Sequence, residues 1–235
     1  MAARLEDKTL VALKGGVNLR FFFHSVRYSE DIDFDVTVIA KNTLTRKVDE
    51  LLRAPLVVAP LAAKGLAIVD LSKPKQTETT QRWKAGVRVE ETGAVIRTRI
   101  EFSRRDAIAG AKFEAIPSSV ASAHGLPPFL VMHYERPRAI LQKIRALHDR
   151  REPQPRDIFD LNLLFAQQAS PLDVSREERP MIPGAIERAR SVSFADYSAK
   201  VVPYLEPDHF ELFSSRESWD LIQTVVVERL QEILA

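Results

Sequence analysis

The chain has 235 residues, of which 45% are hydrophobic, so it can bury a substantial core as one large or two small domains. It carries 34 Lys and Arg against 32 Asp and Glu, a near balance that neither requires nor excludes a nucleic-acid partner. The lack of cysteine excludes disulfides and thiolate metal sites, and no apolar run approaches the roughly 18 residues of a membrane span, so we expect a cytoplasmic protein.

The first expected elements surround a pair of glycines. The stretch from Thr9 to Leu13 predicts an entry strand or the end of a helix, and the apolar run that follows predicts a helix from Gly15 to about His24. Glycines at a helix start let backbone N–H groups approach a phosphate, helped by the positive end of the helix dipole. Lys14, Gly15 and Gly16 are therefore candidate nucleotide-binding residues, although a lone glycine pair is more often a turn.

An alternating acidic segment comes next, within a strand predicted to end near Ile39. Asp31, Asp33 and Asp35 alternate with apolar residues, so the three carboxylates share one face of the strand. Repulsion and desolvation oppose like charges placed side by side, and a compensating cation is expected. Mg²⁺ suits this role because it takes carboxylates, waters and substrate phosphates as ligands, whereas a calcium loop would need Gly and Glu further along the segment.

The rest of the first half reads as helix followed by sheet. The expected elements are a helix over Thr43–Arg53, a helical extension over Leu56–Ala63, a strand over Leu66–Leu71, a mobile loop over Ser72–Thr80, and strands over Arg82–Glu90 and Ala94–Arg104. In the last strand, Glu101 lies on the polar face with Arg97 and Arg99. A cross-strand salt bridge with an arginine is one explanation of this glutamate, and a catalytic role is the other.

The second half is predicted to be mainly helical. Prolines and Gly125 indicate a connector up to Pro128, and helices are expected after Pro137 and from Arg156, then at 185–189, 194–202 and from 215 onwards. Asp157 and Asp160 lie one turn apart on adjacent surface of the Arg156 helix. The histidines lack zinc-like spacing, and no Ser-His-Asp grouping is evident.

Two separated blocks carry a resemblance to a known family. The order K-G-G-x-x-L-R followed by R-x-S-E-D-I-D-F covers residues 14–34, and I-L-Q-K-I-R-A-L-H-D-R followed by P-R-D-I-F-D-L covers residues 140–150 and 155–161. Over roughly residues 13–165 the chain resembles the AbiEii/AbiGii nucleotidyltransferase toxins, which are minimal members of the DNA polymerase β-like superfamily. The resemblance implies an α+β fold, with a mixed-sheet nucleotidyltransferase lobe over 1–125 and a mainly helical lobe over 126–235.

The resemblance also implies roles for individual residues. The metal ligands would be Asp31, Asp33 and Glu101; the nucleotide-binding residues would be Lys14, Gly15, Gly16, Ser29, Lys143 and Arg156; and the catalytic residues would be Asp31, Asp33, Glu101, Lys143 and Asp157. Asp160 is expected to be structural, and Asp35 fits either a solvent-facing or a functional role. A cation at a helix start is unfavourable, so Arg156 should have a partner, which would be Asp33, Asp157 or a substrate phosphate.

The function implied is transfer of a nucleoside monophosphate from an NTP to an acceptor, with Mg²⁺ or Mn²⁺ as the metal. The resemblance implies the toxin of a toxin–antitoxin pair that acts in abortive infection, with a cognate antitoxin and the 3′ end of transfer RNA as acceptor. A phosphate-binding rim for RNA would be formed by Arg104, Arg105, Arg145, Arg150, Arg151 and Arg156. The alternatives are a Mg²⁺-dependent nuclease or phosphohydrolase and a non-catalytic binder of a nucleotide or a protein.

Overall fold

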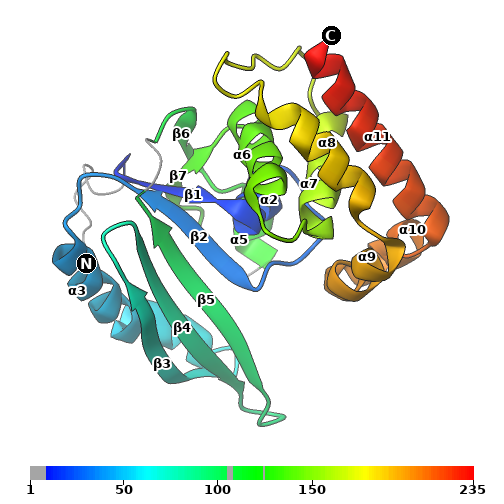
Figure 1. The fold of residues 1–235 in the computed structure, drawn as a ribbon. Coiled ribbons are helices and arrows are strands. Elements are labelled where there is room, and N and C mark those ends of the chain that lie inside the picture. Colours follow the sequence, from blue (N-terminus) through cyan, green and yellow to red (C-terminus); the bar gives the residue numbers. More distant parts are fainter. Residues whose placement is uncertain (1–8, 105–107, 124) are drawn as a thin grey trace.

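A computed structural model describes residues 9–104, 108–123 and 125–235 of the chain. Seven strands of this described part form one mixed sheet in the order β3-β4-β5-β2-β1-β7-β6, with parallel pairing of β1 with β7 and of β2 with β5. Figure 1 shows the strands on one side of the molecule and most of the helices of the C-terminal half on the other. The fold is therefore α+β, as the sequence predicts.

The elements of the first half have these bounds: β1 Val11–Lys14, α2 Gly15–Phe22, β2 Asp31–Val36, α3 Lys41–Arg53, α4 Pro55–Ala62, β3 Leu66–Gln76, β4 Thr80–Val89, β5 Val95–Ser103, β6 Ala111–Ala115, α5 Ser118–Ala123 and β7 Leu130–Tyr134. Those of the second half are α6 Arg136–Asp149, α7 Pro155–Ala166, α8 Met181–Ser191, α9 Phe194–Lys200, the 3-10 helices η1 Val202–Tyr204 and η2 Pro207–His209, α10 Phe210–Phe213 and α11 Arg216–Leu234.

The sheet is amphipathic across β2, β4 and β5, and α3 covers its apolar face. The three strands alternate apolar and polar residues, so every second side chain reaches the same face. Phe102 and Trp83 lie on that face and are buried against Leu44 and Val48 of α3. The carboxylates and arginines of the same strands are consequently left on the opposite face.

The helical half has its own, larger core. Apolar side chains of α6, α7, α8, α9 and α11 form one buried cluster that includes Ile144, Leu161 and Trp219. Leu19 and Phe23, at the end of α2, belong to the same cluster. The helix that follows the glycine pair is thus fixed against the second half of the chain.

Several expected elements differ from the structure. The segment 72–76, expected to be a mobile loop, continues β3, because it pairs with β4 through residues such as Lys75 and Gln76. The expected connector before Pro128 contains β6 and α5. Neither was predicted, because both segments are short and partly polar. β7 was not anticipated either, although its Tyr134 is fully buried.

The proposed division of the chain near residue 125 stays a prediction. The strand β7 follows that position, yet it pairs with β1 at the centre of the sheet, so the polypeptide crosses back into the first lobe before α6 begins. Within the described residues, no helix has the length and apolar character needed to cross a membrane.

Candidate active site

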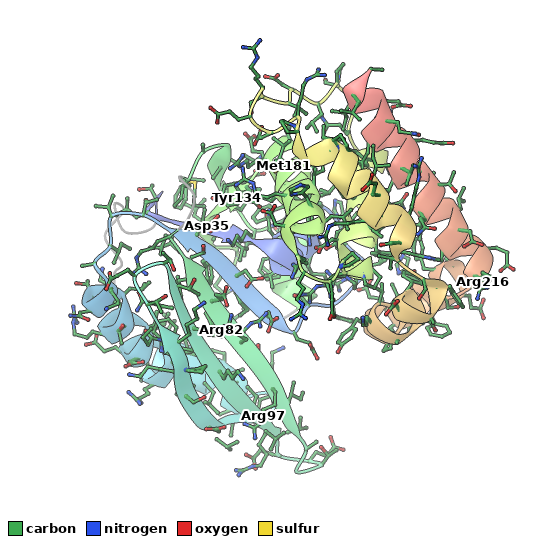
Figure 2. All side chains as sticks on the ribbon, in the orientation of Figure 1. Asp35, Arg82, Arg97, Tyr134, Met181 and Arg216 are labelled. Atoms are coloured by element: carbon green, nitrogen blue, oxygen red, sulfur yellow. The ribbon has the colours of Figure 1, made fainter. Side chains whose placement is uncertain are left out.

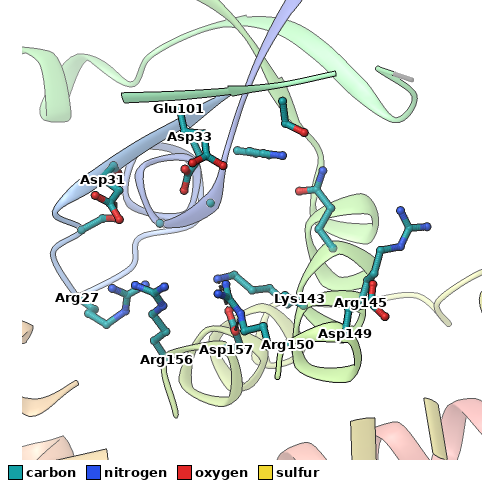
Figure 3. Close-up of a pocket in the computed structure, with 17 residues that line it drawn as sticks. Arg27, Asp31, Asp33, Glu101, Lys143, Arg145, Asp149, Arg150, Arg156 and Asp157 are labelled. Atoms are coloured by element: carbon teal, nitrogen blue, oxygen red, sulfur yellow. Dashed lines mark hydrogen bonds and ion pairs between the residues drawn. The ribbon is translucent and has the colours of Figure 1, made fainter. Parts of the chain in front are cut away.

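A cavity of about 500 Å³ lies between the polar face of the sheet and helices α6 and α7. Figure 3 shows carboxylates on the sheet side and basic side chains on the helix side. The lining residues are Lys14, Gly15, Gly16, Arg27, Ser29, Asp31, Asp33, Glu101, Ser103, Gln142, Lys143, Arg145, Ala146, Asp149, Arg150, Arg156 and Asp157. All of the metal-binding, nucleotide-binding and catalytic residues that the resemblance implies are among them, so two sequence blocks that are far apart in the chain meet at one cavity.

The acidic wall is built by strand register. β2 and β5 run parallel, and this register places Asp33 beside Glu101 and Asp31 beside Arg99. Asp31 forms an ion pair with Arg99, and the two arginine nitrogens Nε and Nη2 of Arg82 contact Oε2 of Glu101 at 2.7 and 2.6 Å. Both explanations of Glu101 therefore apply: it has a cross-strand salt bridge, and it lines the cavity.

Asp33 is the carboxylate that the protein compensates least. Among the described residues it has no hydrogen bond or ion pair within contact distance, whereas its two acidic neighbours each have an arginine. Burial raises the pKa of Asp33, the charges of Asp31 and Glu101 raise it further, and Lys14 and Arg99 oppose the rise only in part. A half-buried carboxylate beside two others is an environment that a bound cation would stabilise.

The donor atoms at this wall suit a hard divalent cation. Asp31, Asp33 and Glu101 supply only oxygen ligands, which Mg²⁺ and Mn²⁺ prefer. In the described part of the chain, no three acidic or histidine side chains converge closely enough to enclose a metal ion. The arginine contacts explain this, because Arg99 and Arg82 each hold one of the three carboxylates.

The glycine pair lets two neighbouring side chains approach the start of α2 closely. Gly15 has φ +67°, and a Cβ there would lie 2.8 Å from Oδ2 of Asp33. At Gly16 a Cβ would lie 2.7 Å from Oγ of Ser29 and 3.3 Å from Nη2 of Arg27. Without side chains at these two positions, Asp33 and Ser29 can pack against the start of α2. Both glycines line the cavity at this helix start, where free backbone amides can bind an anion.

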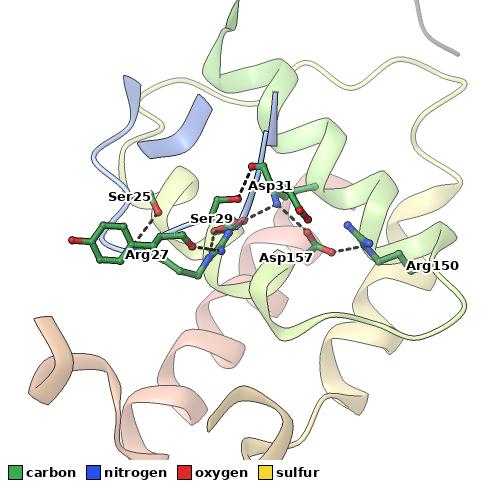
Figure 4. Close-up of polar contacts among 9 residues, drawn as sticks. Ser25, Arg27, Ser29, Asp31, Arg150 and Asp157 are labelled. Atoms are coloured by element: carbon green, nitrogen blue, oxygen red, sulfur yellow. Dashed lines mark hydrogen bonds and ion pairs between the residues drawn. The ribbon is translucent and has the colours of Figure 1, made fainter. Parts of the chain in front are cut away.

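The basic wall belongs to α6 and α7. Lys143 Nζ lies 3.0 Å from Oδ1 of Asp157 and 2.6 Å from Oδ2 of Asp160, and Nε of Arg150 donates to Oδ2 of Asp157 at 2.8 Å. Burial alone would lower the pKa of Lys143, but the carboxylates of Asp160 and Asp157 raise it, so the amine stays charged. Figure 4 shows Asp157 and Arg150 beside the loop that carries Ser29.

The two α7 carboxylates are not surface residues. Asp157 and Asp160 are both fully buried, and of the two only Asp157 lines the cavity. Asp157 is paired with Lys143 and Arg150 and not with Arg156. The Arg156 side chain lines the cavity and forms no ion pair with Asp33, with Asp157 or with any other described residue.

Asp35 has a structural role that its place on the acidic face did not reveal. It is fully buried, accepts a hydrogen bond from the hydroxyl of Tyr134 at 2.8 Å, and lies 2.5 Å from Nζ of Lys14. The carboxylate does not line the cavity. Instead it holds Lys14, whose strand position is directly opposite Asp33.

Arg27 is the main functional candidate that the sequence analysis left without a role. It lines the cavity, and it is 5% exposed because its guanidinium is bound to Asp160. The signal available in the sequence was its place at the start of the R-x-S-E-D-I-D-F block. Of the predicted arginine rim, Arg145, Arg150 and Arg156 line the cavity, Arg104 and Arg151 do not, and Arg105 lies outside the described residues.

Comparisons with known proteins agree with this geometry. A family model described as "Nucleotidyl transferase AbiEii toxin, Type IV TA system" matches residues 1–220. The crystal structure of JHP933 from Helicobacter pylori shares the fold, with a TM-score of 0.57, 18% identity and coverage of 96% of this chain and 87% of that one. A structure described as a candidate nucleotidyltransferase from H. pylori gives a TM-score of 0.57 and 17% identity, covering 97% and 90%. No curated protein sequence matches the chain.

Proposed function

Because this chain belongs to the AbiEii family of nucleotidyltransferase toxins of type IV toxin–antitoxin systems, we propose that it transfers a nucleoside monophosphate from an NTP to a hydroxyl of RNA. The 3′ end of transfer RNA is the proposed acceptor, and a cognate antitoxin is the proposed protein partner. The observation that carries the proposal is the cavity itself, where an acidic wall faces a basic wall across a glycine-lined helix start.

The proposed reaction is an in-line displacement at the α-phosphorus. The oxygen of the acceptor hydroxyl forms a bond to that phosphorus, the bond to the bridging oxygen of the β-phosphate breaks, and pyrophosphate leaves with the electron pair. When bound at Asp31, Asp33 and Glu101, divalent metal ions would stabilise charge on the attacking and leaving oxygens. The remaining catalytic work falls to side chains of the cavity.

Glu101 is the proposed acceptor of the hydroxyl proton. Arg82 contacts only its Oε2 atom, so Oε1 has no hydrogen bond among the described residues. The carboxylate also lies beside Asp33, where the reacting oxygen must arrive. A group within hydrogen-bond reach of the attacking hydroxyl meets the first geometric requirement of a general base.

The triphosphate would lie between the glycine pair and the basic wall. The backbone amides at Gly15 and Gly16 and the hydroxyl of Ser29 would contact its oxygens, since all three residues line the cavity at the start of α2. Lys143 and Arg156 would offset the charge of the phosphates that leave as pyrophosphate. Asp157 acts on Lys143 as a positioning residue, because it is buried and fully occupied by ion pairs.

The experiment is incubation of the protein with Mg²⁺, total transfer RNA and each of the four α-labelled NTPs in turn. Asp33→Asn is the test variant because it keeps the shape of the side chain and removes its charge. Asp220→Asn is the matched control, since Asp220 is an exposed aspartate of α11 that does not line the cavity. We expect label on RNA with wild type and with Asp220→Asn, and a loss of at least about a hundredfold with Asp33→Asn.

Other outcomes would contradict parts of the proposal. RNA shortened without incorporation of label would indicate a nuclease. Label transferred to protein and not to RNA would retain nucleotide transfer but change the acceptor. Equal labelling by wild type and by Asp33→Asn would contradict the proposed role of the acidic wall in the reaction.

A further inference from the structure

We propose that the polar face of β3, β4 and β5 binds the sugar-phosphate backbone of the RNA acceptor. Binding there would direct the end of the RNA toward Glu101. This inference rests on the proposed function and adds a surface outside the cavity. The surface consists of Lys75, Arg82, Lys84, Arg97 and Arg99, and we call it the β-face cluster. None of these side chains lines the cavity.

Strand register places the β-face cluster on the same face as the acidic wall. Asp33 pairs with Glu101, Glu101 pairs with Arg82, and Arg82 pairs with Lys75, so one row crosses from β2 to β3. Residues paired across neighbouring strands project to the same side of a sheet. A phosphate backbone bound to the cations of this row would therefore end at the proposed catalytic carboxylates.

Two cations of the β-face cluster, Lys84 and Lys75, are not offset by a carboxylate of the described residues, whereas its three arginines are. Lys84 is directly opposite Arg99, and Lys75 is directly opposite Arg82. Like charges directly opposite each other on neighbouring strands are destabilising. Lys84 is exposed, and neither it nor Lys75 has an ion pair among the described residues. A polyanion bound across the strands would reduce the repulsion within both pairs of like charges.

Two arginines connect the β-face cluster to the acidic wall. Arg82 is bound to Glu101, and Arg99 is bound to Asp31, so cations of the surface contact carboxylates of the cavity. Farther along β5, Arg97 pairs with Asp70 and its side chain is 68% exposed. Figure 2 shows Arg82 and Arg97 along the strands that extend from the cavity toward the β4–β5 turn.

The opposite face of these strands is already occupied by protein. Trp83 and Phe102 are buried there against α3, and Asp49 of α3 accepts a hydrogen bond from the Trp83 indole. Arg82 and Lys84 alternate with Trp83 along β4, so their side chains project to the other face, away from α3. Arg97 and Arg99 are two residues apart on one strand, about 6.6 Å, which is similar to the separation of successive phosphates in a nucleotide strand. The charge, the spacing and the continuity with Glu101 favour the nucleic-acid acceptor over an acidic protein.

The test measures RNA binding by fluorescence anisotropy, with the full chain and 3′-labelled total transfer RNA over a series of salt concentrations. The test variants are Lys84→Glu and Lys84→Ala, and the matched control is Lys64→Glu, which reverses an exposed lysine at the end of α4 that also has no ion pair among the described residues. We expect Lys84→Glu to weaken binding about tenfold and Lys84→Ala to lower the slope of log K against log salt by about 1. Lys64→Glu should change neither quantity.

Thermal stabilisation of each variant by Mg²⁺ and NTP is measured in parallel, so that the nucleotide site is tested separately. Unchanged RNA binding by Lys84→Glu would overturn the β-face proposal, as would equal weakening by Lys64→Glu. Wild-type protein that is stabilised by NTP but binds no RNA would also overturn it, while leaving nucleotide transfer to another acceptor intact. If Mg²⁺ and NTP did not stabilise the wild-type protein at all, that result would instead contradict the proposed function.

Discussion

Arg27 and Asp160 form a buried ion pair between the loop that precedes β2 and helix α7. Nη2 of Arg27 donates to both carboxylate oxygens of Asp160, at 3.2 and 3.0 Å, and Nε donates at 3.3 Å. Burial would raise the pKa of Asp160, but the charges of Arg27 and Lys143 lower it below its usual value. The pair fixes the loop carrying Ser29, which leads into β2 at Asp31, against the helix that carries Asp157.

Removing one partner of this pair should destabilise the fold. Asp160→Ala leaves Arg27 and Lys143 as buried charges with less compensation, and we expect the free energy of unfolding to fall by about 3–5 kcal/mol. The double variant Arg27→Met/Asp160→Leu should lose less than Asp160→Ala, because it removes a buried cation together with its partner. Urea unfolding of both variants measures the difference, and a double variant less stable than Asp160→Ala would contradict this account.

Gly15 and Gly93 provide a matched pair of backbone positions. Both have positive φ, +67° and +68°, but a Cβ at Gly93 meets no atom within 4 Å, whereas one at Gly15 meets Asp33. Substitution by Ala should cost each fold about 1–2 kcal/mol from backbone strain. Only Gly15→Ala should also reduce nucleotide transfer, by about tenfold or more. Equal activity of the two variants would show that the close approach at Gly15 is unimportant.

Arg156 and Arg151 are a matched pair of cations on one segment of the chain, the first in the cavity and the second on the surface. Arg156 lines the cavity without an ion pair among the described residues, and Arg151 is exposed outside it. We expect Arg156→Ala to raise the KM for NTP about tenfold through loss of a charge-assisted phosphate contact, with little change in stability. Steady-state kinetics and thermal melts of Arg156→Ala and Arg151→Ala test this. A fall in melting temperature without a kinetic effect would assign Arg156 a structural role.

His133 should make stability depend on pH below about 6.5. Burial lowers the pKa of His133, and the nearby Glu114 opposes this only in part. The unfolded chain then binds more protons than the folded protein as pH falls from the ordinary histidine pKa of about 6.5 to the lowered folded value. The free energy of unfolding should therefore fall in that window, by at most about 1.4 kcal/mol per pH unit. Urea unfolding at several pH values should show that His133→Gln loses this slope. The control His24→Asn, at an exposed position whose positive φ asparagine tolerates, should keep it.

The sequence by itself determined the parts of this protein that depend on local pattern. Alternation located β2 and β5, helical spacing located α3, α6 and α7, and the glycine pair with its acidic strand identified the residues of one wall of the cavity. The two quoted blocks also indicated the family, because residue types at fixed spacing are a property of the chain. These features need no knowledge of which segments meet.

Only the tertiary structure decided which partner each charged group has. Asp31, Asp33 and Asp35 are equivalent in the alternation, yet the fold pairs the first with Arg99, leaves the second facing the cavity and buries the third on Lys14. β6 and β7 were not predicted, because formation of a short strand depends more on the strands that it pairs with than on its own residues. The ion-pair partner of a charged side chain likewise depends on long-range strand register and on burial, and neither can be predicted from a local sequence pattern.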